Sequence, residues 1–111
     1  MGSEKRLAML EKITGAGEAD SFAWYGLALE YLSFKRRDEA LAAFETLRKQ
    51  DPDYVAMYLM CGTMLVEQGK PGPAREWLES GLLCARKSGN GHAVSELEEA
   101  IMQLPPPPSI S

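Results

Sequence analysis

Apolar and small residues recur along this chain with the spacing of amphipathic α-helices. In residues 21–34 they fall at i, i+3, i+4 and i+7, as Trp24, Leu27, Ala28 and Tyr31. At 3.6 residues per turn, this spacing gathers them on one helical face. Comparable patterns predict helices over about residues 3–13, 21–34, 38–50, 53–68, 71–87 and 92–104. No segment alternates with a period of two, so we expect an all-α protein.

Capping residues and breakers separate the predicted helices. Ser3 and Asp38 are N-cap candidates, as is Asp20 or Ser21 for the second helix. Pro52 ends the third helix, because proline cannot continue one, and Gly69 suits the residue after a helix end. Pro105–Pro108 stop the last helix and open a proline-rich tail, residues 105–111. We favour a stop or linker over a ligand for a proline-reading domain.

The pattern also repeats itself at an offset of 34 residues. The first copy consists of Trp24, Leu27, Ala28, Tyr31, Ala40 and Phe44, and the second of Tyr58, Cys61, Gly62, Leu65, Ala74 and Leu78. A fixed period in this range indicates one supersecondary unit used more than once. Such folds bury their core between neighbouring units and present a long surface to a partner. Binding is therefore a more natural expectation than catalysis.

These positions resemble the tetratricopeptide repeat, a 34-residue helix-turn-helix unit. Trp24, Leu27, Ala28 and Tyr31 match its first helix, Ala40 and Phe44 its second, and Pro52 its closing proline. The second copy matches less closely, with Arg86 in place of the closing proline. The resemblance covers about residues 20–87. It implies antiparallel helical hairpins, about six helices in all, in a short right-handed superhelix.

The resemblance also implies how the chain is organised. Repeats are expected over about residues 21–54 and 55–88, within a single domain of residues 1–104. Helices 3–13 and 92–104 would cap the two ends, as repeat arrays require. Leu7, Leu10 and Ile13 are expected to cover the first end.

In this family the first helix of each repeat lines a concave groove. Carried over, the candidate partner-binding residues are Phe22, Tyr25, Leu29, Leu32, Leu59, Met60 and Thr63. This apolar set suits an amphipathic helix or an extended hydrophobic peptide of a partner protein. Tyr25 and Leu29 stand where some relatives use polar residues to clamp a carboxylate, so that mode is not expected.

Two alternatives to an open groove remain. The N-terminal helix could fold over the apolar face, which would make Phe22, Tyr25 and Leu29 ordinary core. The face could instead join two copies of the chain, as a homodimer or scaffold without a separate ligand.

Composition narrows the classes of function. The chain has 111 residues, 45% of them hydrophobic, and a net charge of −4. That acidic balance argues against a nucleic-acid partner. No apolar run approaches the roughly 20 residues of a membrane span, and the N-terminus lacks an apolar signal core. We therefore expect no membrane partner and a cytoplasmic location.

The chemistry-bearing residues are few. Two cysteines and one histidine cannot supply a four-ligand zinc site, and no catalytic or phosphate-binding motif is present. We expect no enzyme activity and no cofactor. Cys61 occupies the repeat position of Leu27 and is expected in the core, together with Trp24 and Trp77. The run Lys35–Arg37 is interpreted as a solvated turn.

Overall fold

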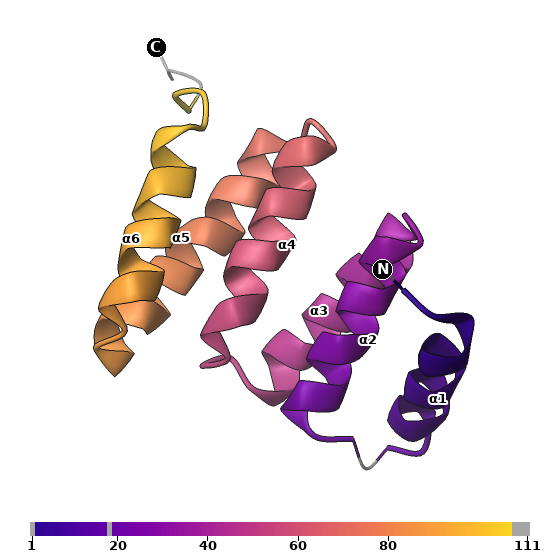
Figure 1. The fold of residues 1–111 in the computed structure, drawn as a ribbon. Helices are drawn as coiled ribbons and strands as arrows, with labels where there is room; N and C mark the ends of the chain where they lie inside the picture. Colours follow the sequence, from indigo (N-terminus) through magenta and orange to yellow (C-terminus); the bar gives the residue numbers. More distant parts are fainter. Residues whose placement is uncertain (1, 18, 108–111) are drawn as a thin grey trace. The chain divides into compact units, whose positions relative to one another are not determined.

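The computed structural model describes residues 2–17 and 19–107, and that part of the chain forms an all-α helical repeat fold. Six helices and no strand occur within it (Figure 1). The chain divides into two compact units, one ending at Tyr54 and the other beginning at Val55. This boundary coincides with the one expected between the two repeats. A single domain and a right-handed superhelix stay predictions.

The first unit contains α1 (Glu4–Gly15), α2 (Ser21–Ser33) and α3 (Arg37–Gln50). Helices α2 and α3 pack together as a hairpin, and α1 lies along α2 (Figure 1). The apolar stripes found in the sequence meet between them. The buried side chains include Leu7, Leu10, Leu27, Ala28, Ala40, Ala43, Phe44 and Leu47.

The second unit contains α4 (Val55–Glu67), α5 (Pro71–Ser88) and α6 (Gly91–Met102). Helices α4 and α5 form the second hairpin, and α6 packs on α5 and also touches α4 (Figure 1). Cys61 is fully buried here and Trp77 nearly so, which confirms both as core. In the segment expected to cap this end, residues 92–104, Leu97 and Leu104 are buried and Ile101 is half-buried.

The turns of the two hairpins are alike in detail. Lys35 and Gly69, which are 34 positions apart, both have positive φ angles, of 58° and 71°. The N–H of Arg36 donates to the carbonyl of Tyr31, and the N–H of Lys70 to that of Leu65, each at 2.9 Å. The repeat in the sequence is therefore a repeat of backbone conformation.

Most helix ends lie within two residues of their expected positions. Ser3 caps α1 and Asp20 caps α2, each accepting a hydrogen bond from a backbone N–H three residues later. Asp38 is not an N-cap, because α3 already begins at Arg37. Helix α6 begins one residue early, at Gly91, where the side chain of Asn90 accepts from a backbone N–H at 3.1 Å.

The C-terminal end of the sixth helix also differs from the prediction. Helix α6 ends at Met102 rather than near Leu104, whose buried side chain lies just beyond it. Pro105–Pro107 follow without regular structure. The rest of the predicted tail lies outside the described residues.

Candidate functional site

In the first unit, the expected partner-binding residues lie on one face of α2. Phe22 is 71% exposed, and Tyr25, Leu29 and Leu32 are half-buried. The ring of Tyr25 packs on that of Tyr54, with centroids 5.2 Å apart and an interplanar angle of 45°. Burial raises the pKa of both phenols, so both are neutral at ordinary pH. This face is therefore largely apolar and open at Phe22, and the carboxylates of Asp51 and Asp20 are near enough to Tyr54 to help raise its pKa.

In the second unit, the corresponding residues lie on α4. Leu59 and Met60 are half-buried and Thr63 is exposed. These side chains follow one another at i, i+1 and i+4, so they occupy neighbouring positions on one side of the helix. Each unit thus carries one set of candidate residues on the first helix of its hairpin. That the two sets form one groove stays a prediction.

Helix α1 packs on a part of α2 centred on Gly26, Glu30 and Tyr31. The side chain of Leu10 lies 3.7 Å from where a Cβ on Gly26 would stand, an ordinary contact distance, so Leu10 packs against this part of α2. Glu30 is buried, although it is charged, because it accepts from the N–H of Ser3 at 3.0 Å and pairs with Arg6 at 3.4 Å. Sequence reasoning missed this anchor. Helix α1 leaves Phe22 exposed, so Phe22 is not core.

The prediction that Leu7, Leu10 and Ile13 form the buried stripe of α1 is wrong at Ile13. Ile13 is 42% exposed, and Thr14 is buried in its place. Thr14 can be buried because its hydroxyl donates to the carbonyl of Leu10 at 2.8 Å. The buried stripe is therefore Leu7, Leu10 and Thr14, which leaves Ile13 and Met9 on an open side of α1.

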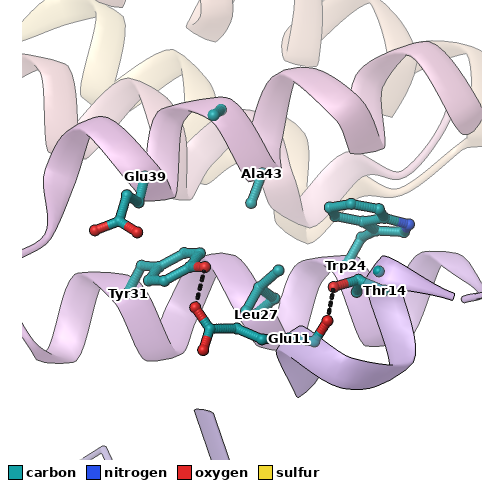
Figure 2. Close-up of a pocket in the computed structure, with 9 residues that line it drawn as sticks. Glu11, Thr14, Trp24, Leu27, Tyr31, Glu39 and Ala43 are labelled. Atoms are coloured by element: carbon teal, nitrogen blue, oxygen red, sulfur yellow. Dashed lines mark hydrogen bonds between the residues drawn. The ribbon is translucent and has the colours of Figure 1, made fainter. Parts of the chain in front are cut away.

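A pocket of about 320 Å³ opens among α1, α2 and α3, entirely within the first unit. Its lining consists of Glu11, Thr14, Gly15, Trp24, Leu27, Tyr31, Glu39, Ala42 and Ala43. Figure 2 shows Trp24, Leu27 and Tyr31 of α2 between the residues of α3 and those of α1. Trp24 is only half-buried, so its assignment to the core is corrected: it forms part of a pocket wall.

Charged groups gather at one end of this pocket. The hydroxyl of Tyr31 donates to a carboxylate oxygen of Glu11 at 2.6 Å (Figure 2). The guanidinium of Arg36 makes two hydrogen bonds to Glu39, at 2.6 and 2.7 Å, and lies 4.0 Å from Glu11. It also lies over the ring of Tyr31, 5.0 Å from the centroid. Arg36 is thus part of an ion-pair network, not only a solvated turn residue.

This network shifts the protonation of its members. Burial, and then the hydrogen bond to Glu11, raise the pKa of Tyr31 to about 12. The hydrogen bonds from Arg36 lower the pKa of Glu39 below its ordinary value. Tyr31 is therefore a neutral donor and Glu39 an anion across the physiological range.

Other candidate chemistry is sparse in the described residues. Within residues 2–17 and 19–107, no three histidine, cysteine or acidic side chains are grouped so that they could hold a metal ion. The side chain of His92 is 87% exposed and lies 3.4 Å from Glu96. No helix in the described part of the chain is both long and apolar enough to cross a bilayer.

Comparison with known proteins identifies similar folds. A family model described as tetratricopeptide repeat matches residues 31–101. A tetratricopeptide repeat domain protein from Salinibacter ruber, known from a solution structure and a crystal structure, is 34% identical with a TM-score of 0.71. The match covers 76% of this chain and 85% or 94% of those chains.

A protein of Bordetella parapertussis, known from a solution structure, is similar over more of the chain. It is 26% identical with a TM-score of 0.76, covering 93% of this chain and 88% of that one. No match to a protein of curated function was found.

Proposed function

Because the chain belongs to the tetratricopeptide repeat family, we propose that it binds a segment of a partner protein along the apolar faces of α2 and α4. The contact residues are Phe22, Tyr25, Leu29, Leu32, Leu59, Met60 and Thr63. The protein acts as a cytoplasmic adaptor, without catalysis and without a cofactor. Domains of this family are generally protein-interaction modules, which supports the class of function.

The observation that carries this proposal is the exposure of Phe22. A phenylalanine that is 71% exposed on a helix of a folded domain leaves most of an aromatic ring in water. Aromatic side chains supply much of the binding free energy when a partner covers them. Tyr25 and Leu29, also partly open, extend the same face along α2. This arrangement favours an apolar or amphipathic ligand.

The face on α4 complements this chemistry. Met60 has a flexible, polarisable side chain that adapts to differently shaped ligands, and Leu59 adds a branched apolar one. Thr63 offers a hydroxyl that can donate to or accept from a bound backbone. An amphipathic helix, with apolar residues at i, i+3, i+4 and i+7, is a ligand of the chemistry that this face favours.

The test is partner capture by a double variant, Tyr25→Glu with Leu59→Glu. Two carboxylates on the apolar faces would have to be desolvated on binding, so we expect the captured partner to be lost. Leu83→Glu is the matched control, because Leu83 on α5 is 66% exposed and outside the candidate set. Capture should be compared by affinity purification and mass spectrometry.

Both variants must keep the helical circular dichroism and cooperative unfolding of the parent protein. Loss of the same captured proteins from the double variant, and not from Leu83→Glu, supports the proposal. Unchanged capture by a folded double variant would refute it.

A further inference from the structure

We propose that the pocket among α1, α2 and α3 binds a basic side chain, lysine or arginine, of a partner polypeptide. Its aliphatic stem would lie over Trp24 and Leu27, and its charge between Glu11 and Glu39. This site goes beyond the proposed function, because the pocket lining shares no residue with the apolar faces of α2 and α4. It would add a charged anchor to an otherwise apolar interaction.

The size of the pocket fits one side chain. Its volume of about 320 Å³ stands at the lower end of the range for ligand pockets, which is roughly 300–1,000 Å³. Small residues of two helices create this space, Gly15 on α1 and Ala42 and Ala43 on α3. These glycine and alanine residues have at most one side-chain carbon. Helices α1 and α3 therefore leave room over the side chains of α2 (Figure 2).

The lining is matched to a long basic side chain along its length. Trp24, Leu27 and Ala43 offer an apolar surface, on which a methylene stem can be buried. Glu11 and Glu39 offer carboxylates to the charged end. The ring of Tyr31, which lies at the same end as these carboxylates, adds attraction for a cation within about 6 Å of its centroid (Figure 2). A neutral apolar side chain would bring no positive charge to balance the two carboxylates.

Charge balance leaves a place for one more cation. The two carboxylates carry two negative charges, and the guanidinium that pairs with both, that of Arg36, carries one positive charge. Arg36 lies over Tyr31 without lining the cavity, so the cavity itself stays available. A monocationic guest would neutralise the remaining charge. Arg36 also shows that a cation is stable beside these groups.

The test uses the full chain and a side-chain probe. Nα-acetyl-lysine methylamide is titrated into ¹⁵N-labelled protein, and the indole N–H signal of Trp24 is followed by NMR. Trp77 is buried in the second unit and serves as the internal reference. Nα-acetyl-norleucine methylamide, which has a neutral apolar side chain without the ammonium, is the matched neutral probe.

We expect a saturable shift of the Trp24 signal, with the Trp77 signal unmoved. The norleucine probe should bind about fivefold or more weakly, the discrimination expected of an ion pair with a cation–π contact. Absence of a saturable shift at Trp24, or equal binding of the two probes, would overturn the proposal.

Substitutions with opposite expected effects separate binding from general damage. Glu39→Gln removes one carboxylate and should weaken binding of the lysine probe several-fold. Arg36→Gln removes the competing internal cation and should strengthen it. Ala42→Leu, at an exposed position of the lining, should block the pocket without disturbing the core.

The apolar-face variant separates this site from the proposed function. Tyr25→Glu should leave binding of the lysine probe unchanged, whatever it does to partner capture. Parallel loss of binding in Glu39→Gln and Arg36→Gln would mean that the charges act through folding alone, and would sink the proposal.

Discussion

At the scale of single residues, two glycines of the second unit hold α4 and α5 close together. A Cβ on Gly62 would stand 2.5 Å from Cδ2 and 2.6 Å from Cγ of Leu78, a fully buried side chain. A Cβ on Gly81 would collide with Cβ of Tyr58, which cannot move without its helix. Neither site therefore has room for a methyl group.

We predict that Gly81→Ala destabilises the protein by about 1–2 kcal/mol. Overpacking costs roughly 1–3 kcal/mol, and the better helix propensity of alanine offsets up to about 1 kcal/mol of that. Gly62→Ala should cost a comparable amount, because the clashing side chain of Leu78 is fully buried. The measurement is the free energy of unfolding in urea. Gly72→Ala is the control, since its Cβ meets nothing within 4 Å, and a cost there equal to that at Gly81 would contradict the packing argument.

Tyr31 makes the stability depend on pH in the alkaline range. Its pKa is raised to about 12 in the folded protein, whereas an unfolded tyrosine titrates near 10. Between these values the folded protein keeps a proton that the unfolded chain releases, so stability falls as pH rises from about 10 to about 12. Below pH 10 both states are protonated, so the contribution of Tyr31 to stability is fully present and does not change with pH.

We predict that Tyr31→Phe loses less stability than the parent between pH 9 and pH 11. The variant lacks the phenolic proton, and the other tyrosines with a raised pKa, Tyr25 and Tyr54, are common to both proteins. Urea midpoints at the two pH values measure the difference. An equally steep fall in both proteins would show that the titration of Tyr31 does not cause this dependence.

At the scale of helices and turns, the two hairpin turns share one backbone conformation but place different residues in it. The turn between α2 and α3 places Lys35 at a φ of 58°, and the equivalent turn between α4 and α5 places Gly69 at 71°. Left-handed backbone is costly for a residue with a Cβ and free of that cost for glycine. The first hairpin therefore contains a strained turn that the second avoids.

We predict that Lys35→Gly stabilises the protein by about 0.5–1 kcal/mol. Removing the Cβ relieves about 1–2 kcal/mol of strain, and part of this gain is offset by the greater freedom of glycine in the unfolded chain. Thermal or urea unfolding measures the change. Lys49→Gly, at an exposed position of α3, is the control and should destabilise, because glycine weakens a helix. A Lys35→Gly variant less stable than the parent would contradict the assignment of strain.

At the scale of the whole molecule, the proposed function requires that the apolar faces stay available to a separate partner. We predict a mass of 12.2 kDa that does not change with concentration, measured by light scattering on a size-exclusion column. A mass that doubles with concentration, and returns to that of one chain in Tyr25→Glu, would favour a homodimer through the same face. Leu83→Glu again serves as the control.

Local elements and their equivalence were predictable from the sequence. The helices follow from apolar spacing, and most ends lie within two residues of their predicted positions, because caps such as Ser3 and Asp20 act on backbone groups a few residues away. The burial of Cys61 was predictable too, because a repeat places equivalent residues in equivalent surroundings. The family followed from the same positions.

The pocket and the rotation of α1 could not be predicted in this way. Which side of α1 faces α2 depends on contacts between residues far apart in the chain, such as Ser3 with Glu30 and Glu11 with Tyr31. Those contacts bury Thr14 in place of Ile13. They also leave Trp24 beside an open cavity, where the repeat pattern alone predicted core.

The sequence by itself determined six helices, two equivalent hairpins and the repeat family, because each depends on spacing within one turn or one repeat. Only the tertiary structure decided which apolar residues remain exposed, which carboxylates gather at the pocket, and where a buried glutamate anchors α1. Those outcomes depend on how the helices pair, because close packing and the hydrogen bonding of buried polar groups involve residues that are distant in sequence.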